Sequence, residues 1–154
     1  MAIIEKSTLS FLKDLAKNNH REWFNAHKDR YLLAYENVIA FTDALLAEMN
    51  KHDHIETPSG KASLMRIYRD TRFSNDKTPY KTYFGGGFKR ATKQLRGGYY
   101  FEIGPGHTLA AGGFFNPEPA DLLRIRKDID YNYKAWNNML ANKKLSGTFG
   151  SLQG

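Results

Sequence analysis

The chain has 154 residues, a formal net charge of +7 and no cysteine. This length suits a single domain over residues 1–154 whose core needs no cross-link, and the lack of cysteine excludes disulfides, thiol catalysis and cysteine-ligated zinc. No stretch approaches the roughly 18 consecutive apolar residues of a membrane span, and Glu5 and Lys6 interrupt the apolar run that a signal peptide needs, so we expect a cytoplasmic protein without membrane contact.

The first third of the chain has the apolar spacing of helices. Ser7 or Thr8 can cap a first helix that runs to Ala16. A short helical turn over residues 20–27 and a longer helix over residues 29–49 follow. In the longer helix, apolar side chains recur every three or four residues, which predicts one buried face.

After a polar linker over residues 51–60, the apolar pattern changes to alternation, which predicts β-strands. The four predicted strands are Ala62–Asp70, Thr82–Lys89, Tyr99–Ile103 and Thr108–Phe115. The connection between the last two is short and rich in glycine, which favours antiparallel pairing because parallel strands need a long crossover. We therefore expect an antiparallel four-stranded meander.

Helical patterns resume after the predicted strands. One helix is expected to start near Pro117–Pro119, since proline is tolerated in a first turn, and a second carries Trp136. Residues 146–154 have no closing helix or strand, so we expect either a frayed terminus or a chain shortened at its C-terminal end. N-terminal helices, a central meander and C-terminal helices together predict an α+β fold.

Positive charge is concentrated in residues 61–100. This window holds ten basic residues against two acids, a net charge of +8, so the other 114 residues sum to −1. Its arginines are interspersed with aromatic residues, a combination typical of oxyanion recognition because guanidinium groups bind oxyanions bidentately and stack on rings. The predicted partners are phosphorylated small molecules or nucleic acid.

The loop over residues 71–82 joins two predicted strands and is too long and too charged for a tight hairpin, which is typical of a functional loop. The predicted oxyanion clamp consists of four cations, Arg66, Arg72, Lys77 and Lys81. The wider set of predicted ligand-binding residues adds Arg21, Arg69 and Tyr80. If the site is catalytic, we expect Asp70 or Asp76 to act as a general base or metal ligand in phosphoryl or phosphodiester chemistry.

Two alternative functions stay open. The chain could be a nucleic-acid-binding module whose sheet exposes rings such as Tyr68, Tyr83 and Tyr99 for base stacking.

It could also be a structural or interaction protein whose charged loop is an ion-paired brace. In that case Asp70 would pair with Arg72 or Arg66. Asp76 would pair with Lys77 or Lys81.

Two other motifs give weaker evidence about function. The run Gly85-Gly86-Gly87 within a predicted strand indicates a bulge or a close backbone approach, and it is neither a P-loop nor a dinucleotide-binding motif. His52-Asp53-His54 contains metal-ligand types but lies in the polar linker, and good metal sites need a full ligand set with a second shell, so we predict no metal site.

Several segments resemble domain-of-unknown-function family 2461. They are residues 19–24 (NHREWF), 66–73 (RIYRDTRF), 76–81 (DKTPYK) and 116–119 (NPEP). The resemblance covers essentially the whole chain and implies a stand-alone protein, with members that usually continue further, but it implies no activity. The characteristic family residues fall here on Arg21, Trp23, Phe24, Arg66, Arg69, Asp70, Arg72, Phe73, Asp76, Lys77, Pro79, Tyr80 and Lys81.

Overall fold

The computed structural model describes residues 2–91 and 95–151. These residues form two compact units, Met1–Phe115 and Asn116–Gly154. The expectation that residues 1–154 make one domain stays a prediction.

The first unit begins with a layer of helices, as predicted. The helices are α1 (Lys6–Lys17), α2 (Arg21–Ala26) and α3 (Lys28–Met49). The expected cap at Ser7 or Thr8 is wrong, because α1 already begins at Lys6 and has no side-chain cap. Thr8 is instead buried, and its hydroxyl donates to Asn37 Oδ1 of α3 at 2.8 Å, which ties the two helices together.

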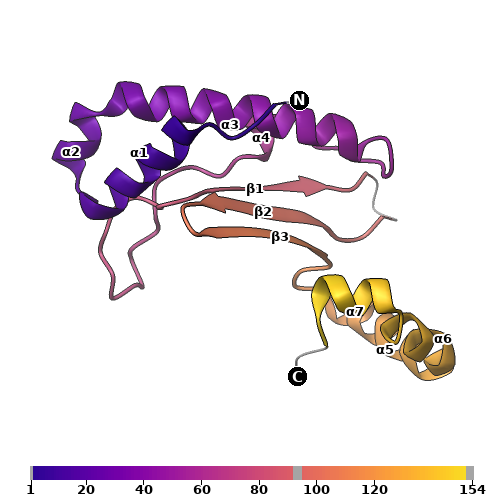
Figure 1. Ribbon diagram of the computed structural model, residues 1–154. Coiled ribbons are helices and arrows are strands. Elements are labelled where there is room, and N and C mark those ends of the chain that lie inside the picture. The colour runs from indigo at the N-terminus through magenta and orange to yellow at the C-terminus, as the bar shows by residue number, and fades with distance from the viewer. Residues whose placement is uncertain (1, 92–94, 152–154) are drawn as a thin grey trace. The chain divides into compact units, whose positions relative to one another are not determined.

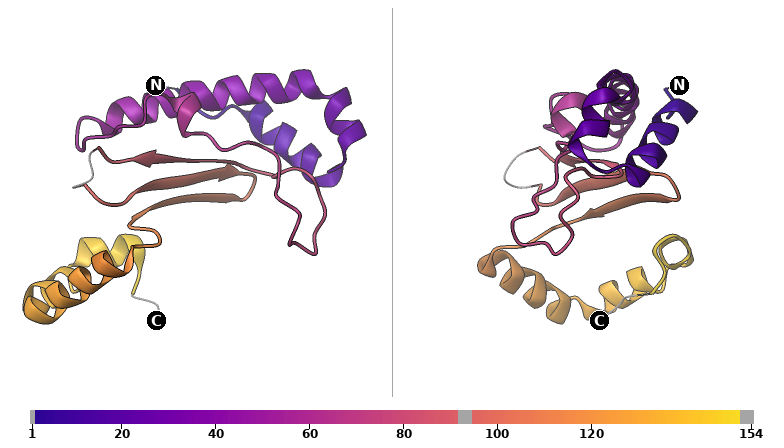
Figure 2. Two further views of the ribbon diagram at one scale, coloured as in Figure 1. Left: turned by 180° about the vertical axis from the view of Figure 1, so that it is seen from behind. Right: turned by 90° about the vertical axis from the view of Figure 1, so that its left-hand side faces the viewer.

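In the described part of the first unit, residues 2–91 and 95–115, a three-stranded antiparallel sheet lies against this helical layer (Figures 1 and 2). Its strands, in the order β1-β2-β3, are β1 (Phe84–Lys89), β2 (Gly98–Gly104) and β3 (His107–Gly113). Because strand side chains alternate between faces, Phe84, Phe88 and Phe101 share the face toward the helices, where all three are buried. The core therefore lies between the helical layer and one face of the sheet.

The predicted fourth strand, Ala62–Asp70, is wrong. Its first residues belong to a short helix, α4 (Gly60–Ser63), and the rest meets other segments only at isolated bridges, such as Leu64 with Gly86. The alternation of side chains did indicate extended backbone. A strand also needs a continuous partner, however, and here the chain leaves β1 after a single contact.

The second unit consists of helices α5 (Pro119–Tyr131), α6 (Tyr133–Leu140) and α7 (Lys143–Phe149). The first two confirm the predicted helical segments. Helix α7 corrects the expectation that residues 146–154 hold no closing element, since Asn142 caps it by accepting a hydrogen bond from Lys144 N at 2.9 Å. No helix in the ranges that the structure describes is long and apolar enough to span a bilayer.

Candidate functional site

The charged loop is closed at its base by its own backbone. Arg69 N donates to Pro79 O at 2.9 Å, and Lys81 N donates to Ile67 O at 2.8 Å. These two bonds hold the limbs antiparallel, so that the loop between them projects beyond the end of the sheet (Figures 1 and 2).

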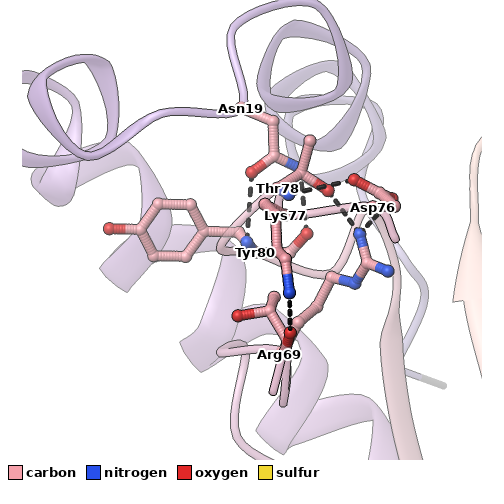
Figure 3. Close-up of polar contacts among 7 residues, drawn as sticks. Asn19, Arg69, Asp76, Lys77, Thr78 and Tyr80 are labelled. Atoms are coloured by element: carbon pink, nitrogen blue, oxygen red, sulfur yellow. Dashed lines mark hydrogen bonds and ion pairs between the residues drawn. The ribbon is translucent and has the colours of Figure 1, made fainter. Parts of the chain in front are cut away.

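Tyr80 anchors the loop to the helical layer. The residue is 3% exposed, and its ring stacks on Phe24 of α2 with the ring centroids 4.0 Å apart. Its backbone bonds the side chain of Asn19 in both directions (Figure 3). Tyr80 was predicted to bind ligand; the structure places it in the core, where burial raises the pKa of its hydroxyl.

Asp76 is held inside the loop by hydrogen bonds from Thr78 and Arg69. Thr78 N donates to Asp76 Oδ1 at 2.9 Å, and the guanidinium of Arg69 contacts both Asp76 and the Thr78 hydroxyl (Figure 3). The backbone hydrogen bond from Thr78 and the contact with Arg69 lower the pKa of Asp76 to about 2, and the bond from Thr78 has the larger effect. The expected pairing of Asp76 with Lys77 or Lys81 is replaced by pairing with Arg69.

Asp70 is paired with Arg72, one of the two pairings expected for it. Arg72 donates through Nη2 to Asp70 Oδ2 at 2.6 Å and through Nε to Oδ1 at 3.0 Å. This forked contact lowers the pKa of Asp70. Carboxylates held ionised in this way are weak proton acceptors near neutral pH, which argues against Asp70 or Asp76 as a general base.

A cavity of about 590 Å³ opens between the loop, the end of α1 and the start of β1. It is lined by Ala16, Asn19, Arg69, Asp70, Asp76, Thr78, Tyr80, Lys81, Thr82 and Tyr83. Five of the residues predicted to form the site therefore do meet around one cavity. The lining charges balance, because two cations face two carboxylates.

Lys81 differs from Arg69, the other cation that lines the cavity. Its ammonium donates to the backbone carbonyl of Arg66 at 3.0 Å, and among the described residues no carboxylate lies within 4.0 Å of it. Burial lowers the pKa of Lys81, and the nearby positive charge of Arg66 adds to this effect. Lys81 is thus a partly desolvated cation in a cavity wall.

The remaining predicted residues lie outside the lining of this cavity. Arg72 is exposed and paired with Asp70, and Lys77 Nζ donates to the carbonyl of Thr71 at 2.9 Å. Arg66 and Arg21 are exposed. Of the four cations in the predicted clamp, only Lys81 lines the cavity. The arginine that lines it is Arg69, not Arg66 or Arg72.

The glycines of β1 make no bulge, because residues 84–89 pair with β2 one for one. The expected close backbone approach does occur at Gly86, where a Cβ would lie 2.9 Å from Ser63 O. At Gly85 the near neighbours are side chains. A Cβ on Gly85 would lie 3.2 Å from the ring of Tyr83 and 3.4 Å from the hydroxyl of Tyr100. The missing side chain makes room for these tyrosines on the sheet face that points away from the helices.

A second cavity of about 810 Å³ adjoins the first and was not predicted. Its lining comes from α1 and the β2–β3 hairpin, namely Leu12, Lys13, Ala16, Lys17, Thr82, Tyr83, Glu102, Gly104, Pro105, Gly106 and His107. The turn at residues 104–106 was recognised in the sequence. A two-residue turn pairs Gly104 with His107, which puts His107 diagonal to Glu102, and this register was the signal that could have found the pair.

The motif His52-Asp53-His54 is used for structure. Arg90 donates to Asp53 Oδ2 through Nε at 2.6 Å, and Tyr99 donates to the same oxygen at 2.7 Å. These two hydrogen bonds lower the pKa of Asp53, and the one from Arg90 has the larger effect. In the described part of the chain, no group of three or more metal-ligand residues surrounds a common point.

The sequence matches the family described as a conserved hypothetical protein, DUF2461, over residues 7–154. The chain belongs to this family. No curated protein and no solved structure matches the sequence. Residues 66–81, part of the segment that resembles this family in sequence, form the loop and one wall of the first cavity of this DUF2461 protein.

Proposed function

We propose that the first cavity binds a small phosphate-containing anion through Lys81 and Arg69. The observation that carries the proposal is the ammonium of Lys81, which lines the cavity with no carboxylate partner among the described residues. A partly desolvated cation attracts an oxyanion more strongly than a cation in bulk water does. The proposal includes a cytoplasmic location, which the cysteine-free composition favours.

Arg69 supplies the second contact. Its contacts with Asp76 and Thr78 both use Nη1, and no bond of its Nε or Nη2 to another described residue is found. These two groups form one edge of the guanidinium and can bind two oxygens of a phosphate at once. In this arrangement Asp76 positions the arginine and does not act as a base.

Isothermal titration of the full chain with inorganic phosphate, sulfate and nucleotides tests the proposal. Lys81→Met should weaken phosphate binding by about 10- to 100-fold, the range for one charge-assisted hydrogen bond. Lys61→Met is the matched control, because Lys61 is exposed on α4 and does not line the cavity. Wild-type protein that binds none of these anions, or equal affinities for the two variants, would contradict the proposal.

A second candidate function is a structural brace, which both ion pairs of the loop support. Arg69 with Asp76 and Arg72 with Asp70 join charged residues that lie near one another in sequence. If bracing is the whole role, Asp76→Lys should destabilise the loop, and wild-type protein should bind no anion. Calorimetric unfolding and titration of the same samples separate the two candidates.

The nucleic-acid alternative has less support. Tyr99 shares the helix-facing side of the sheet and donates to Asp53, whereas Tyr83 approaches Gly85 on the opposite side. Tyr68 is 53% exposed but lies beyond the strands. These three rings form no common stacking platform, so the affinity for single-stranded oligonucleotides should stay low.

A further inference from the structure

The two cavities adjoin along one wall. Ala16, Thr82 and Tyr83 line both of them. An anion held at Lys81 would therefore lie near Tyr83, and a water molecule in the second cavity could approach it from that side, opposite the organic group. The site has room for more than an inorganic ion, since the two cavities measure about 590 and 810 Å³.

The second cavity contains a carboxylate and an imidazole in contact. Glu102 Oε2 lies 3.3 Å from His107 Nδ1, while its other oxygen accepts a hydrogen bond from the hydroxyl of Tyr100 at 2.5 Å. The side chain of Glu102 is only 15% exposed, and that of His107 is 66% exposed. The hydroxyl therefore holds a largely buried carboxylate in place beneath an imidazole that solvent and ligands can reach.

This contact leaves one nitrogen of His107 for chemistry. A carboxylate beside Nδ1 favours the form of the ring with a proton there, so that Nε2 carries the lone pair. When Nε2 accepts a proton, the carboxylate attracts the positive charge that forms on the ring. Glu102 is a positioning residue in this arrangement, and His107 is the group that exchanges protons.

We propose that the adjoining cavities form one hydrolytic site for phosphate esters, with His107 as the general base. The proposal rests on the anion binding proposed above for Lys81 and Arg69. A water molecule attacks phosphorus, its oxygen forms the new P–O bond, and its proton moves to Nε2 of His107. The P–O bond to the organic group breaks, that group leaves with the bonding electron pair, and His107 returns its proton to solvent.

The test uses the full chain with p-nitrophenyl phosphate and bis(p-nitrophenyl) phosphate, whose product p-nitrophenolate needs no added proton to leave. Wild-type protein should hydrolyse at least one of the two esters. His107→Gln should lower kcat by about 100-fold or more, as expected for loss of a general base, with phosphate affinity within about 2-fold of wild type because no binding contact is removed. Glu102→Gln should lower kcat with little change in KM. His52→Gln is the matched control and should keep wild-type turnover, because His52 is exposed and lines neither cavity.

The outcomes separate the two proposals. If wild-type protein binds phosphate but hydrolyses neither ester, or if His107→Gln turns over as wild type does, the catalytic assignment is overturned and anion binding stands. If wild-type protein binds no phosphate, both fall. Equal thermal midpoints for wild type and His107→Gln would show that a loss of turnover is not a loss of fold, since the side chain is largely exposed.

Discussion

Asn19 and Tyr80, 61 positions apart in sequence, bond each other in both directions. The side-chain amide of Asn19 donates to Tyr80 O at 2.9 Å, and Tyr80 N donates to Asn19 Oδ1 at 3.1 Å. A single asparagine thus serves as a strand partner for one residue of the loop (Figure 3). These bonds fix the backbone of Tyr80, the residue that precedes Lys81, beside the end of α1.

Replacing Asn19 should therefore loosen the loop and weaken anion binding together. Asn19→Ala leaves the N–H and C=O of Tyr80 without their partner, which should lower the free energy of unfolding by about 1–3 kcal/mol. Asn25→Ala, an exposed asparagine of α2, should change it by less than about 0.5 kcal/mol. Urea unfolding of both variants measures the difference, and equal values would refute the anchoring role.

The carboxyl of Asp76 should stay ionised in acid. Its pKa is lowered to about 2 in the fold, against roughly 3.9 for an ordinary aspartate. Because the folded value is the lower one, the contribution of Asp76 to stability is complete above about pH 4 and is lost as the pH falls toward 2. At pH 3 the ¹³C carboxyl signal of Asp76 should still be that of the carboxylate. A mostly protonated signal in folded protein would show that the contacts with Thr78 and Arg69 do not form.

Gly60 should tolerate no side chain. A Cβ at this position would lie 2.5 Å from Thr42 Oγ1 and 2.6 Å from Asp43 N, which belongs to the backbone of α3. Gly60→Ala must push α4 away from α3 and should cost about 1–3 kcal/mol of unfolding free energy. Gly147→Ala in α7 is the control, since nothing lies within 4 Å of its Cβ position, and it should be neutral or slightly stabilising. Thermal unfolding that ranks the two variants the other way round would be inconsistent with this packing.

The sequence predicted α1 to α3, α5, α6 and the three strands because their patterns are local, whereas it missed α4 and α7. Apolar spacing marks α1 and α3, and alternation bounded by glycine turns marks β1 to β3. The predicted strand at Ala62–Asp70 failed because alternation reports only on backbone extension. Whether an extended segment joins a sheet depends on a partner elsewhere in the chain, and here that partner meets it at single residues.

The site was predictable in its residues but not in their pairing. Both cations and both carboxylates of the cavity lie in the segment that the sequence singled out. Which arginine meets which carboxylate depends on loop geometry, and Arg69 meets Asp76 only because the limbs of the loop close between Arg69 and Pro79. His107 escaped notice because its partner, Glu102, becomes a neighbour only through the hairpin register.

The most direct measurement of anion binding at Lys81 is an anomalous difference map from crystals of the full chain soaked in selenate, a heavy-atom analogue of sulfate. We expect a selenium peak in the first cavity, with an oxygen within hydrogen-bond distance of Lys81 Nζ and another facing the guanidinium edge of Arg69. A map with no peak beside Lys81, or with peaks only at exposed cations such as Arg72, would contradict anion binding at Lys81.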